Sequence, residues 1–185
     1  MVKEMNPDAI IIAVGASETI PPIKGIDKKL VISATHALEI EDQLKGNIII
    51  LGGGTVGAEI ALEQSLIHKN NVSIIELGDE LATQGNMLYK IGLRQTMEKC
   101  ESLTTYLNTQ CTEVKDNSVI IKNEAGIIKE IPADKVIVCT GMKSLNILAE
   151  SFYGITPNVT MIGDCVKPRK IMEAVFEGHS IALNL

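Results

Sequence analysis

Runs of largely hydrophobic residues, rather than strictly alternating ones, mark the first strands of this chain. They occupy residues 8–15, 48–51 and 72–76, and a further short run covers residues 159–164. Such runs are typical of strands that are covered on both faces, as in a parallel sheet with helices beside it. We therefore expect these four segments to be buried strands.

Helical spacing of hydrophobic residues follows several of these runs. Helices are predicted over residues 37–43, 56–68, 86–100 and 170–185. Ser33 or Thr35 is expected to cap the first helix, because a hydroxyl oxygen accepts a hydrogen bond from an orphan amide at a helix start. In the last helix, the positions expected to be buried are Ile171, Ala174, Val175, Ile181 and Ala182.

Short strands separated by turn residues fill the third quarter of the chain. They are expected over residues 110–114, 118–122, 127–131 and 135–140. Asp116 and Asn117 form one turn signal, and residues 123–126 form the next. The first three strands are predicted to form an antiparallel meander, and the fourth returns to the buried sheet.

A glycine motif joins the strand at 48–51 to the helix that follows. The spacing Gly52, Gly54 and Gly57 is that of a dinucleotide-binding loop, with Gly53, Thr55 and Val56 as the intervening candidates for cofactor contact. Glycine permits the tight turn, the approach of a pyrophosphate and close helix packing. The anion would meet exposed amides and the positive helix end. A purely structural turn is the alternative, but the strand and helix around the motif disfavour it.

Glu76 ends the next strand, where a carboxylate accepts hydrogen bonds from the adenosine ribose hydroxyls. Asp79 and Glu80 add negative charge, and no Lys or Arg lies between Glu76 and Tyr89 to bind a 2′-phosphate. NADH is therefore predicted over NADPH. The alternative is that these residues form an ordinary solvated acidic loop. The fold class predicted is α/β, a Rossmann-like parallel sheet with an antiparallel β-meander.

Composition excludes several other functions. A net charge of −6 and an aromatic content of 3% disfavour nucleic acid as a partner. No hydrophobic run approaches the roughly 20 residues that cross a bilayer, so neither a membrane partner nor an export signal is expected. The cysteines form no CxxC pair, which indicates reduced thiols in a cytoplasmic protein and no zinc ribbon. We expect no metal site and no catalytic side chain. His36, His68 and His179 are given structural roles, the first two at the surface.

Further motifs carry a resemblance to a known family. Strands end at Gly15 and Gly141, Ala58 and Glu59 follow the glycine loop, and residues 162–171 read IGDCVKPRKI. Together these resemble the C-terminal part of NADH:flavin oxidoreductases of the 2,4-dienoyl-CoA reductase and enoate reductase type. In these two-dinucleotide-binding-domain flavoproteins, an NAD domain is inserted into an FAD domain. The FAD/NAD(P)-binding domain fold is thus implied.

The resemblance assigns residues to the flavin. It implies that Gly163 and Asp164 bind the ribityl chain of FAD and that Lys170 and Ile171 lie at the helix start facing the flavin. Gly15 and Gly141 would mark the crossings between domains. The domains expected are 46–140 for NAD, with 1–45 and 141–185 as the remnant of a discontinuous FAD domain. From the residues alone, Asp164 would be a helix cap or loop residue.

The resemblance also implies missing parts. The glycine loop of the FAD domain, the barrel and the iron-sulfur cysteines of the family are not in this sequence. The chain is therefore expected to be an inactive fragment with an incomplete FAD site. In the intact enzyme, electrons would pass from NADH to FAD and then through a 4Fe-4S cluster and FMN to an unsaturated enoate or dienoyl-CoA substrate.

Two other functions fit parts of the sequence. A stand-alone module that senses NADH without catalysis agrees with the lack of catalytic side chains. A third possibility is a relative of the disulfide reductases, but the missing CxxC motif argues against it.

Overall fold

The structure, a computed structural model, describes residues 2–184 and divides into two compact units. One unit is Ile20–Gly141, and the described residues before and after it form the other. The first crossing between the units precedes the boundary expected near residue 46. It does so because β3 (Val31–Ser33) pairs in parallel with β10 (Lys135–Val138) and thereby joins the Ile20–Gly141 unit. The assignment of a cofactor to each unit stays a prediction.

A five-stranded parallel sheet forms the centre of the Ile20–Gly141 unit, and its strand order is β3-β10-β4-β5-β6. The other strands are β4 (Asn47–Leu51), β5 (Asn71–Ile75) and β6 (Leu103–Tyr106). This sheet and the antiparallel strands beside it confirm the predicted α/β class. Strand β6 was not predicted. It lies at the edge of the sheet and carries exposed threonines at its centre, so it lacks the hydrophobic run of the inner strands.

Each inner strand buries both faces, and neighbouring residues pack on opposite sides. Ile48 and Ile50 belong to one hydrophobic cluster, whereas Ile49 and Leu51 belong to another. All four side chains are almost completely buried. The continuous run in the sequence is thus explained by a strand between two layers.

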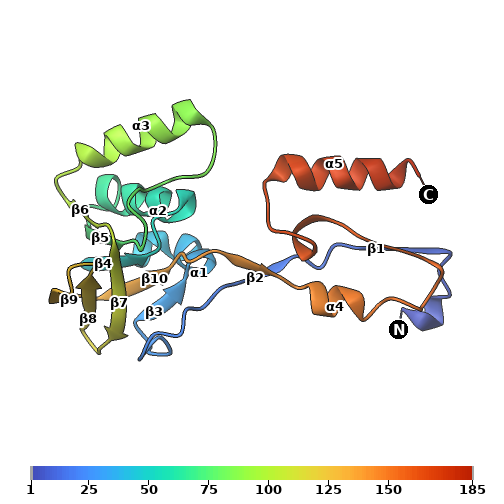
Figure 1. Cartoon of the computed structure of the whole chain (residues 1–185), viewed down its shortest axis with the longest axis horizontal. Helices are drawn as coiled ribbons and strands as arrows, with labels where there is room; N and C mark the ends of the chain where they lie inside the picture. Colours follow the sequence, from blue (N-terminus) through green and yellow to red (C-terminus); the bar gives the residue numbers. More distant parts are fainter. Residues whose placement is uncertain (1, 185) are drawn as a thin grey trace. The chain divides into compact units, whose positions relative to one another are not determined.

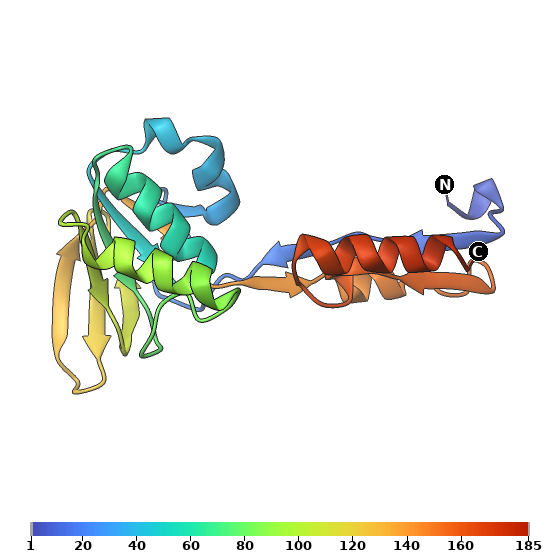
Figure 2. The ribbon, with the colours of Figure 1, turned by 90° about the horizontal axis from the view of Figure 1, so that it is seen from above.

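Helices cover one face of the sheet and a meander covers the other (Figures 1 and 2). The helices are α1 (Ala34–Glu39), α2 (Thr55–Leu66) and α3 (Met87–Glu98). The meander strands are β7 (Thr109–Val114), β8 (Ser118–Asn123) and β9 (Ile128–Pro132), paired antiparallel in that order. The Ser33 hydroxyl caps α1 by accepting from the His36 amide at 3.1 Å, and the Asn86 side chain caps α3.

The second unit has little regular structure around a small core. Strand β1 (Ala9–Ile12) pairs in parallel with β12 (Asn158–Met161), and β2 (Ala16–Glu18) pairs antiparallel with β11 (Met142–Ser144). The short helix α4 (Asn146–Glu150) and the pair β2 and β11 were not predicted, since each is only a few residues long. The buried core residues are Ile12, Ala149 and Cys165.

Helix α5 (Ile171–Ala182) has the predicted position, but the burial expected for it is wrong. Within the described residues it buries no side chain, and Ile171 is 84% exposed. Val175 and Phe176 are exposed as well. A hydrophobic pattern shows that a helix has an apolar face, but not whether the same chain covers that face. None of the described helices is long and apolar enough to cross a membrane.

Because the inner strands of the central sheet are buried on both faces, a cavity made there by truncating a side chain should destabilise the fold. Ile137 in β10 is fully buried in the helix-side cluster, so Ile137→Ala should lower the free energy of unfolding by about 2–5 kcal/mol. Ile128→Ala, at a position that is 67% exposed, should change it by less than about 0.5 kcal/mol. Urea unfolding followed by circular dichroism measures both. Equal losses would contradict the burial assigned to β10.

Candidate functional site

The glycine loop begins where β4 ends, at a residue with left-handed backbone geometry. Gly52 has φ of +101°, and a Cβ built on it would lie 2.5 Å from the carbonyl oxygen of Cys139. Both facts require glycine at this position. The chain can therefore turn sharply at the carboxyl end of a central strand.

Gly57 brings α2 against the loop. A Cβ at Gly57 would lie 2.1 Å from the carbonyl oxygen of Gly52 and 3.2 Å from the Cβ of Cys139. Any larger residue would displace the helix, so the close packing expected from the motif has a direct geometric cause. Gly53 is restricted too, because a Cβ there would lie 2.1 Å from a methyl carbon of Leu81.

Gly54 differs from the other loop glycines because it faces open space. A Cβ built on it meets no atom within 4 Å, and the residue is the N-cap of the twelve-residue helix α2. No packing within the described residues explains a glycine here. The geometry leaves room for a ligand group beside the amides of the first helical turn, where the helix dipole favours an anion. Val56, in the same turn, is 51% exposed.

Glu76 lies beside this loop, although many residues separate them in sequence. One carboxylate oxygen accepts a hydrogen bond from the Gly53 amide at 2.5 Å, and the other accepts from the Gly78 amide at 2.7 Å. The side chain is half-buried. The carboxylate is therefore held at the carboxyl edge of the sheet, and it binds the residue that precedes the open position at Gly54.

The segment after β5 is fixed to the glycine loop. The Ala82 amide donates to the Gly53 carbonyl oxygen at 2.7 Å, and the Thr55 hydroxyl donates to the Gln84 carbonyl oxygen at 3.0 Å. Thr55 thus has a structural partner in this segment. These bonds fix the position of Glu76 relative to α2.

The structure also brings in a cation that the sequence argument did not consider. Arg94, in α3, donates to the Glu80 carboxylate at 3.0 Å and to the Leu81 carbonyl oxygen at 2.7 Å. Counting basic residues between positions 76 and 89 missed it, because α3 folds back along the segment after β5. Its guanidinium is engaged by Glu80, while the Asp79 side chain stays exposed.

The second unit holds the Gly-Asp motif in a closed loop before α5. Gly163 has φ of +68°, and its amide donates to the Glu177 carboxylate at 2.6 Å. Asp164 accepts from the Arg169 amide at 3.2 Å, and Arg169 forms an ion pair with Glu177. The Gly163 amide, with a further contribution from Arg169, lowers the pKa of Glu177 below its ordinary value.

The remaining predicted contacts to flavin lie in the same unit or at its border. Lys170 is the N-cap of α5, and its amide donates to the Glu173 carboxylate at 3.1 Å, while Ile171 is the first helical residue. Gly15 has φ of +78° and accepts from the Leu145 amide at 3.1 Å. Gly141, with φ of +95°, is the last residue of the Ile20–Gly141 unit.

The cysteines show no reactive arrangement among the described residues. Burial raises the pKa of Cys111 to about 11, so its thiol stays protonated at neutral pH. Cys165 is fully buried, and its thiol contacts the carbonyl oxygens of Ile12 and Ile162 at 3.3 and 3.0 Å.

Comparisons with known proteins agree with this architecture. The family model for pyridine nucleotide-disulphide oxidoreductases matches residues 2–178. The chain is 31% identical to bilirubin reductase of Mediterraneibacter gnavus over 98% of its own length and 28% of that protein. It is 28% identical to cinnamate reductase of Clostridium sporogenes over 100% of its own length and 27% of that protein.

Solved structures show the same relationship. A 2-naphthoyl-CoA reductase in complex with 2-naphthoyl-CoA superposes with a TM-score of 0.88 at 29% identity, covering 100% of this chain and 28% of that one. Thioredoxin reductase of Lactococcus lactis superposes with a TM-score of 0.79 at 22% identity, covering 95% of this chain and 64% of that one, which shows a shared fold. The chain thus spans under a third of the first of these structures.

The loop before α5 predicts a pH dependence. Because the folded pKa of Glu177 is lowered, its stabilising contribution is present above the ordinary glutamate pKa and is lost as the pH falls through the folded value. Hydrogen exchange over residues 162–178 should therefore lose protection in acid. Glu177→Gln should flatten this dependence, whereas Glu150→Gln, at an exposed position of the same unit, should keep it. An unchanged profile in Glu177→Gln would contradict the role of this carboxylate.

Proposed function

Because the chain belongs to the pyridine nucleotide-disulphide oxidoreductase family, we propose that it supplies the NADH-binding unit and part of the flavin-binding unit of a flavin-dependent reductase. The observation that carries this proposal is the open position at Gly54 beside the carboxylate of Glu76, which binds the amide of the preceding residue, Gly53. Among the described residues no packing contact requires glycine at position 54, and the Gly53 and Gly78 amides hold the Glu76 carboxylate beside this loop.

The charges and the open position of this arrangement support NADH as the ligand. Gly54 and the first turn of α2, including Val56, would accept the pyrophosphate, while Glu76 would accept hydrogen bonds from the ribose hydroxyls. The same carboxylate would repel a 2′-phosphate. Arg94 is paired with the Glu80 carboxylate, so much of its positive charge is compensated there rather than offered to a 2′-phosphate.

The chain's residues would bind and orient rather than transfer protons. When bound, NADH supplies a hydride and FAD accepts it. The second unit would contribute Gly163 and Asp164 to the ribityl side of the flavin, with Lys170 and Ile171 at the helix start. Asp164 accepts the Arg169 amide within its own loop, and its carboxylate would in addition accept hydrogen bonds from the ribityl hydroxyls. Gly141 would form one crossing between the units, whereas Gly15 lies within the second unit, just before β2.

The names of three relatives support a proposal for the substrate class. These names, bilirubin reductase, cinnamate reductase and 2-naphthoyl-CoA reductase, each specify an unsaturated compound. We therefore propose that the intact protein reduces an unsaturated enoate or acyl-CoA compound. By the family resemblance, we also propose an FMN site and a 4Fe-4S cluster for the remainder of the intact protein, of which this chain spans only a part, as it spans 28% of the bilirubin reductase.

The open position predicts that a larger side chain blocks NADH without unfolding the protein. Gly54→Val should weaken NADH binding by about 10- to 100-fold, through the loss of one charge-assisted hydrogen bond worth about 1.5–3 kcal/mol. Gly92→Val in α3, where added atoms also meet open space, is the matched control and should bind NADH normally. Calorimetric titration measures both. Unchanged affinity in Gly54→Val would refute the pyrophosphate contact.

Glu76 predicts the choice between the two nicotinamide cofactors. The wild-type chain should bind NADH more tightly than NADPH, and Glu76→Gln should reduce that ratio by about tenfold, since a charge-assisted hydrogen bond and a repulsion are both removed. Glu101→Gln, at an exposed position, is the control and should keep the ratio. Equal or tighter NADPH binding by the wild-type chain would overturn the role of Glu76.

A further inference from the structure

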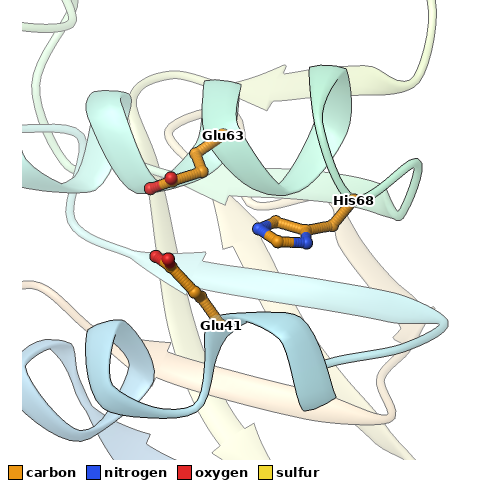
Figure 3. A group of neighbouring side chains, drawn as sticks. All are labelled: Glu41, Glu63 and His68. Carbon is orange, nitrogen blue, oxygen red and sulfur yellow. The ribbon is translucent and has the colours of Figure 1, made fainter.

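Three potential metal ligands meet at the end of α2 that lies opposite Gly54. Glu41 comes from the short helix η2 (Glu41–Gln43), Glu63 from the last turns of α2, and His68 from just beyond that helix. One ligand atom from each lies within 4.8 Å of the others. Figure 3 shows the two carboxylates facing each other across a gap, with the Nε2 edge of the imidazole directed toward it.

His68 gives an independent reason to look for a ligand here. We expected a surface histidine, but its side chain is only 8% exposed. Its Nε2 atom is buried and has no hydrogen-bond partner. Most buried polar atoms in native proteins are paired, so an unpaired nitrogen that faces two carboxylates requires an explanation.

We propose that Glu41, Glu63 and His68 bind a divalent transition-metal cation of the Zn²⁺ type. One imidazole and two carboxylates are ligands that Zn²⁺ accepts, and the two negative charges neutralise the ion. The three protein ligands leave the fourth position for water. Because the three ligand atoms lie within 4.8 Å of one another, small rotations of the half-buried glutamate side chains would bring them to bonding distance of an ion between them.

Asp42 completes the arrangement on the other side of the imidazole ring. Its carboxylate lies 3.6 Å from Nδ1 of His68. This distance is longer than a hydrogen bond, but the negative charge beside Nδ1 would favour the proton there and leave the lone pair of Nε2 directed at the gap. Metal-bound histidines commonly have such a partner on the second nitrogen.

The backbone that carries these ligands is held in place by two buried amide side chains. Gln64 donates to the Glu41 carbonyl oxygen at 3.4 Å, and Asn70 donates to the Leu44 carbonyl oxygen at 2.9 Å and to Gln64 at 2.8 Å. The His68 amide donates to the Glu63 carbonyl oxygen at 3.2 Å. Helix η2 and the end of α2 are therefore positioned before any ion arrives. The ion would join the segment before β4 to the helix after it.

The test is titration of the chelator-treated chain with Zn²⁺ in a calorimeter. We expect one ion per chain, with affinity reduced on the order of 100-fold or more in His68→Gln and in Glu63→Gln, since loss of a ligand should exceed the 10- to 100-fold effect of losing its supporting partner. His36→Gln is the matched control, because His36 also lies near a carboxylate, that of Glu39 at 3.2 Å, but is exposed. It should bind Zn²⁺ as the wild type does.

Thermal unfolding provides a second readout. Saturating Zn²⁺ should raise the melting temperature of the wild type and of His36→Gln but not that of the ligand variants, because only the folded site binds the ion. If His68→Gln fails to fold, Glu63→Gln at a half-buried position decides alone. Substituting Co²⁺ for Zn²⁺ reports the ligand type, and a thiolate charge-transfer band would show that cysteine binds the metal instead. That result would overturn the site. So would the absence of saturable Zn²⁺ binding, or an affinity in the folded ligand variants equal to that of the wild type. The site also does not depend on the proposed function, since NADH affinity should be unchanged in Glu63→Gln.

Discussion

The close approach of β4 and α2 is the constraint on which the rest of the structure depends. A Cβ added at Gly57 would lie 2.1 Å from the Gly52 carbonyl oxygen, and one added at Gly52 would lie 2.5 Å from the carbonyl oxygen of Cys139, just after β10. Strand β4 cannot yield, because it is paired on both sides by β10 and β5 and buried on both faces. The loop between strand and helix is therefore rigid, and its open side is left at Gly54.

Much of the central sheet was predictable because each inner strand has a simple environment. Residues such as Ile49 and Ile50 are both hydrophobic since each faces a different covered layer, so the sequence shows an unbroken run. The glycine spacing then fixed the strand, turn and helix around it. Edge strand β6 was not predicted, because its two central threonines are exposed and the strand therefore shows no hydrophobic run in the sequence.

Features that depend on contacts between distant segments were not predictable. Arg94 reaches Glu80 only because α3 folds back, and His68 becomes buried only because η2 packs near the end of α2. The separation of Glu41 and His68 in the sequence matches no common metal-binding motif. Helix α5 shows the opposite error, since its apolar face was taken as buried although Ile171 and Phe176 are exposed within the described residues. In a protein of which this chain is a part, that face would be available to pack against other segments.

The most direct test of the account is to titrate the ¹⁵N-labelled chain with NADH and follow its amide resonances. The Gly53 and Gly78 amides donate to Glu76, and Gly54 opens the helix beside them. We expect these three amides to show the largest shifts, because the ribose and the pyrophosphate would change their hydrogen bonding. Saturable binding of NADH that leaves the three resonances unmoved would contradict the central claim that this loop and this carboxylate form the cofactor site.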